Sequence, residues 1–96
     1  MIYEYNNSNL NDGLYFFYAS WNSHCNLLIE RLNKLSNDFP TLNIYKVNSS
    51  KYTNLKRQLK VNKIPSYLLI KNNNINSRRD GNIDSYSLKI WIKDNI

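Results

Sequence analysis

One uninterrupted apolar segment, residues 14–19 with the sequence LYFFYA, constrains the fold of this 96-residue chain more than any other feature. Its side chains are aliphatic or aromatic throughout, so neither face of the segment is polar. A strand with two apolar faces is typical of the interior of a sheet that helices cover on both sides. The segment therefore predicts a central strand, and we expect its aromatic side chains in the core, not stacked on nucleic acid bases.

The longest amphipathic segment follows this strand. Residues 23–37 predict a helix, because four leucines recur at helical spacing and charged residues take the other face. The apolar positions of this helix are Leu27, Leu28, Leu32 and Leu35. Asn22 or Ser23 can cap its free amide groups, and Pro40 marks a stop beyond its end.

The remaining segments alternate between strand and helix patterns. Further strands are predicted for residues 1–5, 42–47, 66–70 and 75–79, the last two joined by the turn sequence KNNN. Residues 52–61 predict a short basic helix, residues 6–13 a loop or weak helix, and the segment from Ser85 a final helix that buries Leu88, Trp91 and Ile92. This order predicts a single α/β domain, residues 1–96, with parallel strands and an antiparallel edge.

Composition narrows the class of protein. Hydrophobic residues at 42% and charged residues at 21% are globular values, and no apolar run approaches the roughly 18 residues that cross a membrane. A single cysteine cannot form an internal disulfide, and no secretory signal precedes the first strand. We therefore expect a reducing, cytoplasmic location and no membrane contact.

The stretch FFYASWNSHC, residues 16–25, resembles the active-site signature of the thioredoxin family, a buried strand followed by Ala-x-Trp-Cys-x-x-Cys. Ala19, Trp21 and Cys25 fall on matching positions. Ile64-Pro65-Ser66 also matches the family's Ile-Pro-Thr, and Gly81 a glycine of its last strand. The resemblance implies the thioredoxin fold, a central mixed sheet of four to five strands flanked by three to four helices, with a cis peptide bond before Pro65.

Three positions depart from the family pattern. Asn22 stands where the family has its attacking cysteine. Phe16 replaces the buried aspartate that accepts the proton of the resolving thiol, although Lys46 matches the lysine that pairs with that aspartate. Glu30 replaces a proline that kinks the helix. Since both the attacking thiolate and the proton relay are missing, the resemblance implies loss of ordinary dithiol chemistry.

Cys25 falls on the family's resolving position, and His24 before it resembles protein disulfide isomerase more than thioredoxin. A positive or hydrogen-bonding His24 would stabilise a Cys25 thiolate. Cys25 is then either a residue kept from an ancestral pair or a monothiol that forms mixed disulfides or accepts glutathione, a Cys25–Cys25 disulfide between two chains included. One cysteine and one adjacent histidine are too few ligands for a metal ion, and we expect neither metal nor cofactor.

These observations lead to three hypotheses of function. The first is a thioredoxin-like protein without oxidoreductase activity that binds a polypeptide in a groove around Trp21, Ser23, His24, Ile64 and Pro65. The second is a monothiol redox protein that acts through Cys25. The third, from the net charge of +6, is a basic adaptor for an acidic protein or nucleic acid that uses Lys56, Arg57, Lys60, Arg78 and Arg79. A solvated basic surface explains that charge more simply, so we expect a polypeptide partner, no nucleic acid, and a monomer or weak dimer.

Overall fold

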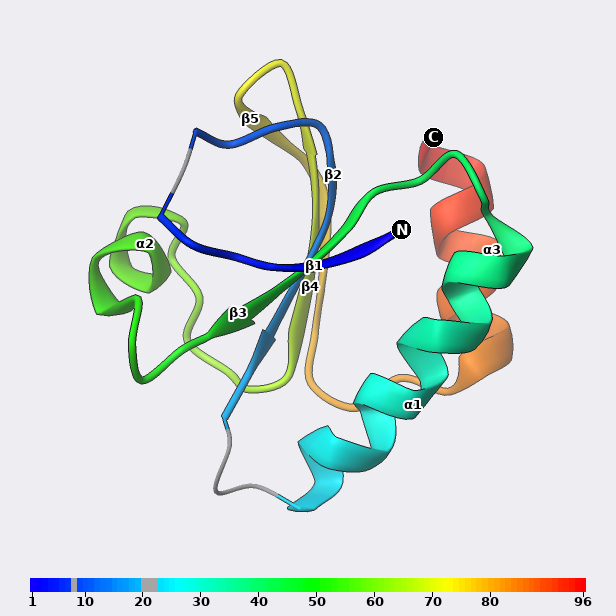
Figure 1. The fold of residues 1–96 in the computed structure, drawn as a ribbon, viewed down its shortest axis with the longest axis horizontal. Helices are drawn as coiled ribbons and strands as arrows, with labels where there is room; N and C mark the ends of the chain where they lie inside the picture. The colour runs from blue at the N-terminus through cyan, green and yellow to red at the C-terminus, as the bar shows by residue number, and fades with distance from the viewer. Residues whose placement is uncertain (8, 20–22) are drawn as a thin grey trace.

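A computed structural model describes residues 1–7, 9–19 and 23–96, and the side chains of all of these except residues 23–26. The described part contains a five-stranded mixed sheet and three helices (Figure 1). The strands are β1 (Ile2–Glu4), β2 (Gly13–Tyr18), β3 (Ile44–Asn48), β4 (Ser66–Lys71) and β5 (Asn74–Asp80); the helices are α1 (Ser23–Asp38), α2 (Thr53–Gln58) and α3 (Ser85–Asn95). The predicted α/β architecture is confirmed.

The apolar segment occupies the middle of the sheet, as predicted. The strand order is β1-β3-β2-β4-β5, so β2 has two neighbours on each side. β1, β3 and β2 run parallel, while β4 is antiparallel to β2 and β5 to β4. Because β2 and β4 run in opposite directions, the end of β2 lies beside the beginning of β4, with Phe17 opposite Ser66.

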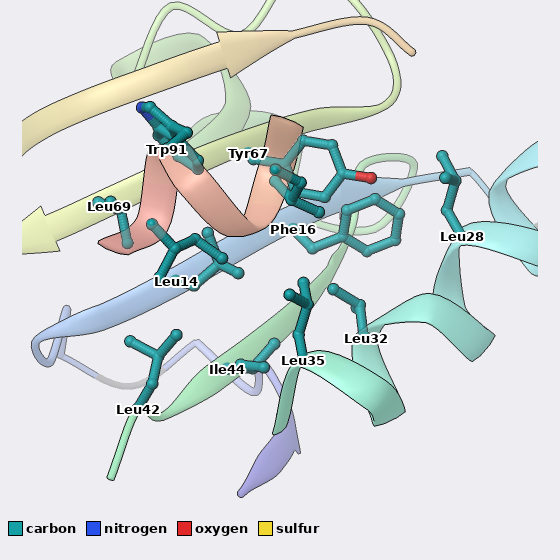
Figure 2. Close-up of a cluster of buried hydrophobic side chains, with 12 residues drawn as sticks. Leu14, Phe16, Leu28, Leu32, Leu35, Leu42, Ile44, Tyr67, Leu69 and Trp91 are labelled. Atoms are coloured by element: carbon teal, nitrogen blue, oxygen red, sulfur yellow. The ribbon is translucent and has the colours of Figure 1, made fainter. Parts of the chain in front are cut away.

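Alternation along β2 divides the core into two layers. Leu14 and Phe16 face α1 and α3, where they pack with Leu28, Leu32 and Trp91 (Figure 2). Tyr15 and Phe17 face α2 and pack with its leucines on the other side of the sheet. These four side chains are fully buried, which confirms their prediction as core residues. Tyr18, also expected in the core, is only partly buried and packs against the edge of the layer that faces α1.

The buried face of α1 is narrower than predicted. Leu28, Leu32 and Leu35 are buried, at spacings of four and three residues that place them on one side of the helix. The assignment of Leu27 to this face was wrong, since its side chain is 61% exposed. Its position, about 100° around the helix from Leu28, turns it toward solvent.

The two other helices begin close to the predicted positions. α2 is shorter than the predicted segment 52–61, yet Leu55 and Leu59 are both buried. In α3, Leu88, Trp91 and Ile92 are buried as predicted. The side chain of Asp84 caps this helix, because the Ser87 amide donates to Asp84 Oδ1 at 2.8 Å.

The peptide bond between Ile64 and Pro65 is cis, as the family resemblance implied. Gly81 lies one residue beyond β5, not within the last strand, and its φ of 81° is in the left-handed region that glycine adopts readily. Its amide donates to the Pro65 carbonyl at 2.7 Å and so extends the pairing of β4 and β5. None of the helices in the described residues has the length and apolarity needed to cross a membrane.

Candidate functional site

The sheet topology brings the two halves of the thioredoxin-like motif to one end of the molecule. β2 ends at Tyr18, and α1 begins at Ser23 at the same end (Figure 1). The Ile64–Pro65 segment precedes β4, which starts there because it is antiparallel to β2. The start of α1 and the Pro65 segment, about forty positions apart in the chain, therefore lie at the same end of the sheet.

The described residues cover only part of this site. Trp21 and Asn22 lie outside them, so the predicted groove contact of Trp21 and capping by Asn22 stay predictions. Ser23, His24 and Cys25 begin α1, but their side chains are outside the description as well. On the facing segment, Ile64 is half-buried and Pro65 is buried.

A buried serine holds the Pro65 segment in place. The Ser66 hydroxyl donates to the Lys63 carbonyl at 2.6 Å and lies 2.9 Å from Asp80 Oδ1. Ser66 is fully buried, so these contacts satisfy a hydroxyl that water cannot reach. Sequence analysis missed the role of Asp80, because only the register of β4 against β5 brings it opposite Ser66.

Arg78 extends this network to α2. Its guanidinium lies 3.2 Å from Asp80 and donates to the carbonyls of Leu59 and Lys60 at 3.2 and 2.9 Å. Arg78 thus satisfies carbonyl groups that the end of α2 leaves without intrahelical partners. Arg79 lies on the other face of the sheet, since successive strand residues point to opposite faces. The two arginines therefore do not form one basic face.

An aromatic ring fills the position at which the thioredoxin family has its buried aspartate. Phe16 is fully buried, and its ring centroid is 5.0 Å from that of Tyr67. Leu28 and Leu32 of α1 belong to the same apolar cluster (Figure 2). Within the described residues, the buried polar side chains include Ser49 and Ser66 and no carboxylate. In this part of the chain, no buried acid can exchange a proton with the site.

Lys46, which matches the lysine partner of that aspartate, contacts a different acid. β1 and β3 pair with Glu4 opposite Lys46, and Lys46 Nζ lies 3.6 Å from Glu4 Oε2. The Tyr18 hydroxyl donates to Glu4 Oε1 at 2.6 Å. Sequence analysis missed this cluster; the alternation of Ile2, Tyr3 and Glu4 placed Glu4 on one face of a strand, but nothing local indicated β3 as its neighbour.

The environment of Tyr18 raises the pKa of its hydroxyl well above the ordinary value of 10.0. Partial burial is the main cause, because it disfavours the phenolate. The hydrogen bond to Glu4 and the negative charge of that carboxylate act in the same direction. Burial likewise raises the pKa of Tyr15 to about 12.

Alkaline pH is therefore expected to destabilise the protein partly through Tyr18. In the unfolded chain Tyr18 loses its proton near pH 10, whereas the folded state retains it. The stability that depends on the protonated hydroxyl is complete below pH 10 and is lost as pH rises toward the folded pKa. Urea unfolding between about pH 9 and 11.5 should show a shallower decline for Tyr18→Phe than for the wild type.

The control for this titration is Tyr86→Phe, which removes an exposed hydroxyl. It should leave the wild-type slope unchanged. Equal slopes for the wild type and both variants would contradict a raised pKa at Tyr18.

Comparison with known proteins agrees with this geometry. The thioredoxin family model matches residues 4–94, while a search of curated proteins finds no match. Among solved structures, thioredoxin-2, described as a component of malaria parasite protein secretion machinery, is 26% identical, with a TM-score of 0.78 over 95% of this chain and 91% of that one. A structure described only as a malarial protein is 25% identical, with a TM-score of 0.76 over 91% of this chain and 99% of that one. Mitochondrial thioredoxin 3 from Saccharomyces cerevisiae, at 24% identity, shares the fold with a TM-score of 0.79 over 90% of this chain and 81% of its own.

Proposed function

Because the chain belongs to the thioredoxin family, we propose that it is a thioredoxin-type protein that binds a polypeptide in the groove beside Pro65 and does not catalyse dithiol–disulfide exchange. The burial of Phe16 carries this proposal. A phenyl ring cannot accept a proton from the resolving thiol. It lies among leucines and another aromatic ring, and the buried polar side chains of the described residues include no acid.

The chemistry of dithiol–disulfide exchange explains why the replacement of the first cysteine matters. A first thiolate attacks a substrate disulfide, a mixed disulfide forms, and one substrate sulfur leaves as a thiolate. A second thiolate then attacks the mixed disulfide and releases the other substrate sulfur. With Asn22 at the first position, the chain has one thiol, Cys25. It cannot complete this cycle without a thiol from another molecule.

The segment around Pro65 supports the polypeptide-binding part of the proposal. Hydrogen bonds from Ser66 to Lys63 and from Gly81 to Pro65 hold this segment against the sheet. Ile64 is half-buried and packs against the apolar cluster beneath α2, so the exposed part of its side chain is held in place. A preorganised apolar contact of this kind loses little conformational entropy when a peptide binds.

The catalytic part can be tested by insulin reduction in dithiothreitol. The wild type should precipitate insulin no faster than dithiothreitol alone, and Cys25→Ser should give the same rate. Wild-type turnover that Cys25→Ser abolishes would refute the proposal.

The alkylation rate of Cys25 against pH tests the monothiol alternative, which the placement of Cys25 in the first turn of α1 favours. A midpoint well below the free-thiol value of about 8.5 would support that alternative.

The binding part needs a probe without free thiols or added charge. Insulin B chain with carbamidomethylated cysteines and an uncharged BODIPY label meets this requirement, and its anisotropy reports binding. Ile64→Ser should weaken binding several-fold. The matched control, Ile75→Ser on β5, removes an isoleucine that is 37% exposed and far along the strand from Gly81, so it should have no effect. Equal affinities for both variants would refute the groove.

A further inference from the structure

The charge of the protein is distributed very unevenly along the chain. No aspartate or glutamate occurs between Asp38 and Asp80, yet nine of the 13 lysines and arginines lie there. The rest of the chain therefore carries more acidic than basic residues. The net charge of +6 arises entirely from this one segment.

The fold gathers five of these cations around α2. Lys56 and Arg57 lie on α2, while Lys51, Lys60 and Lys63 lie in the segments that flank it. Four of the five are exposed and Lys56 is half-buried. We call these five residues the α2 surface. In the described part of the chain, the ion pairs lie elsewhere and involve none of them.

On the opposite side of the sheet, the positive and negative charges of the helices balance. α1, α3 and the cap of α3 carry four cations and four acids: Arg31, Lys34, Lys89 and Lys93 with Glu30, Asp38, Asp84 and Asp94. Lys89 and Asp38 form an ion pair at 3.2 Å. The layers lie on opposite faces of the sheet (Figure 1), so positive potential is concentrated on one side of the molecule.

A depression lies within the α2 surface. Thr53, Lys56, Arg57, Val61 and Asn62 line it, and its volume is about 400 Å³. The lining contains two cations, a hydroxyl and an amide, and no acid. An extended chain that carries carboxylates could place them against Lys56 and Arg57 with hydrogen-bond donors on either side.

We propose that the α2 surface binds an acidic segment of a polypeptide partner. The binding of a polyanion rests on charge alone, whereas the choice of a polypeptide rests on the proposed function. Lys63 precedes Ile64 directly, and Arg78 joins the end of α2 to Asp80 beside Ser66. The Pro65 segment and the α2 surface are therefore neighbours joined by these contacts, so a client in the proposed groove could also reach the α2 surface.

The aromatic residues favour this partner over a single-stranded nucleic acid, which stacks its bases on open ring faces. The aromatic side chain nearest α2 is Tyr52, which is half-buried. Its ring makes an edge contact with Tyr5 at 4.8 Å, and Lys51 Nζ lies 5.4 Å from its centroid. This ring is therefore already in contact with Tyr5 and Lys51, which disfavours the stacking of a base on it.

Fluorescence anisotropy of the full chain with a labelled polyglutamate peptide tests the inference. At low ionic strength the wild type should bind this peptide, and a glycine-serine peptide of equal length should not bind. The double variant Lys56→Glu, Arg57→Glu should weaken binding about tenfold, because two attractions become repulsions. Added salt should reduce wild-type binding steeply.

The matched control is the double variant Lys34→Glu, Lys93→Glu, which changes the net charge equally but on exposed positions of α1 and α3. It should stay within about twofold of the wild type. Equal loss in both double variants would overturn the inference, as would tighter binding of a thymidine oligonucleotide of equal charge. Ile64→Ser should leave polyglutamate binding unchanged, so a failure of the proposed groove remains distinguishable from a failure of the α2 surface.

Discussion

Replacing Phe16 by aspartate is expected to destabilise the protein by about 5 kcal/mol, a large fraction of the stability of a typical domain. Truncation of a buried phenylalanine costs about 3–5 kcal/mol through lost packing. Burial of a carboxyl group among apolar side chains adds a desolvation cost. Phe16 is fully buried between α1 and Tyr67, so neither cost is relieved by water. Urea unfolding followed by circular dichroism measures the change.

The control is Phe16→Leu, which keeps the site apolar and should cost about 1 kcal/mol. Lys46 allows a sharper test of whether this site still accepts an acid, because it lies opposite Phe16 in the register of β2 and β3. If Lys46 left Glu4 and paired with the new carboxylate, Phe16→Asp would cost little more than Phe16→Leu. That result would show that the site still accepts the family's acid and would contradict a commitment of this core to apolar packing.

Replacing Asn22 by cysteine is expected to raise insulin reduction from the dithiothreitol background by a factor on the order of 100. The change creates the spacing Cys-x-x-Cys with Cys25, so a thiolate can attack and a second can release the product. Loss of a catalytic nucleophile costs far more than 100-fold in enzymes that depend on one. The smaller gain expected here reflects the missing proton acceptor at Phe16.

The pH dependence of insulin reduction by Asn22→Cys tests whether the proton relay is missing. With no buried acid among the described residues to take its proton, Cys25 must ionise without a proton acceptor in the core, so turnover should rise steadily with pH. Asn22→Ser, which has a similar small polar side chain without a thiol, should remain at background. High turnover already at pH 6 would contradict the absence of a working proton relay.

Local patterns predicted most of the elements correctly. The run from Leu14 to Ala19 has no polar face, and only a central strand between two layers can bury it. The three helices followed from apolar residues at helical spacing. Leu27 shows the limit of this reasoning, because its apolar side chain lies next to the buried stripe in sequence and about 100° away from it on the helix.

The sequence by itself determined the strand in the middle of the sheet, the helices, and the replacement of the family's cysteine and aspartate by Asn22 and Phe16. These follow from residue types and local periodicity. The tertiary structure alone decided which strands pair, and so that Lys46 contacts Glu4, that Asp80 meets Ser66, and that Arg78 reaches the carbonyl of Leu59. Such contacts join residues that are far apart in the chain, and their energies depend on register. A one-residue shift would replace every one of them.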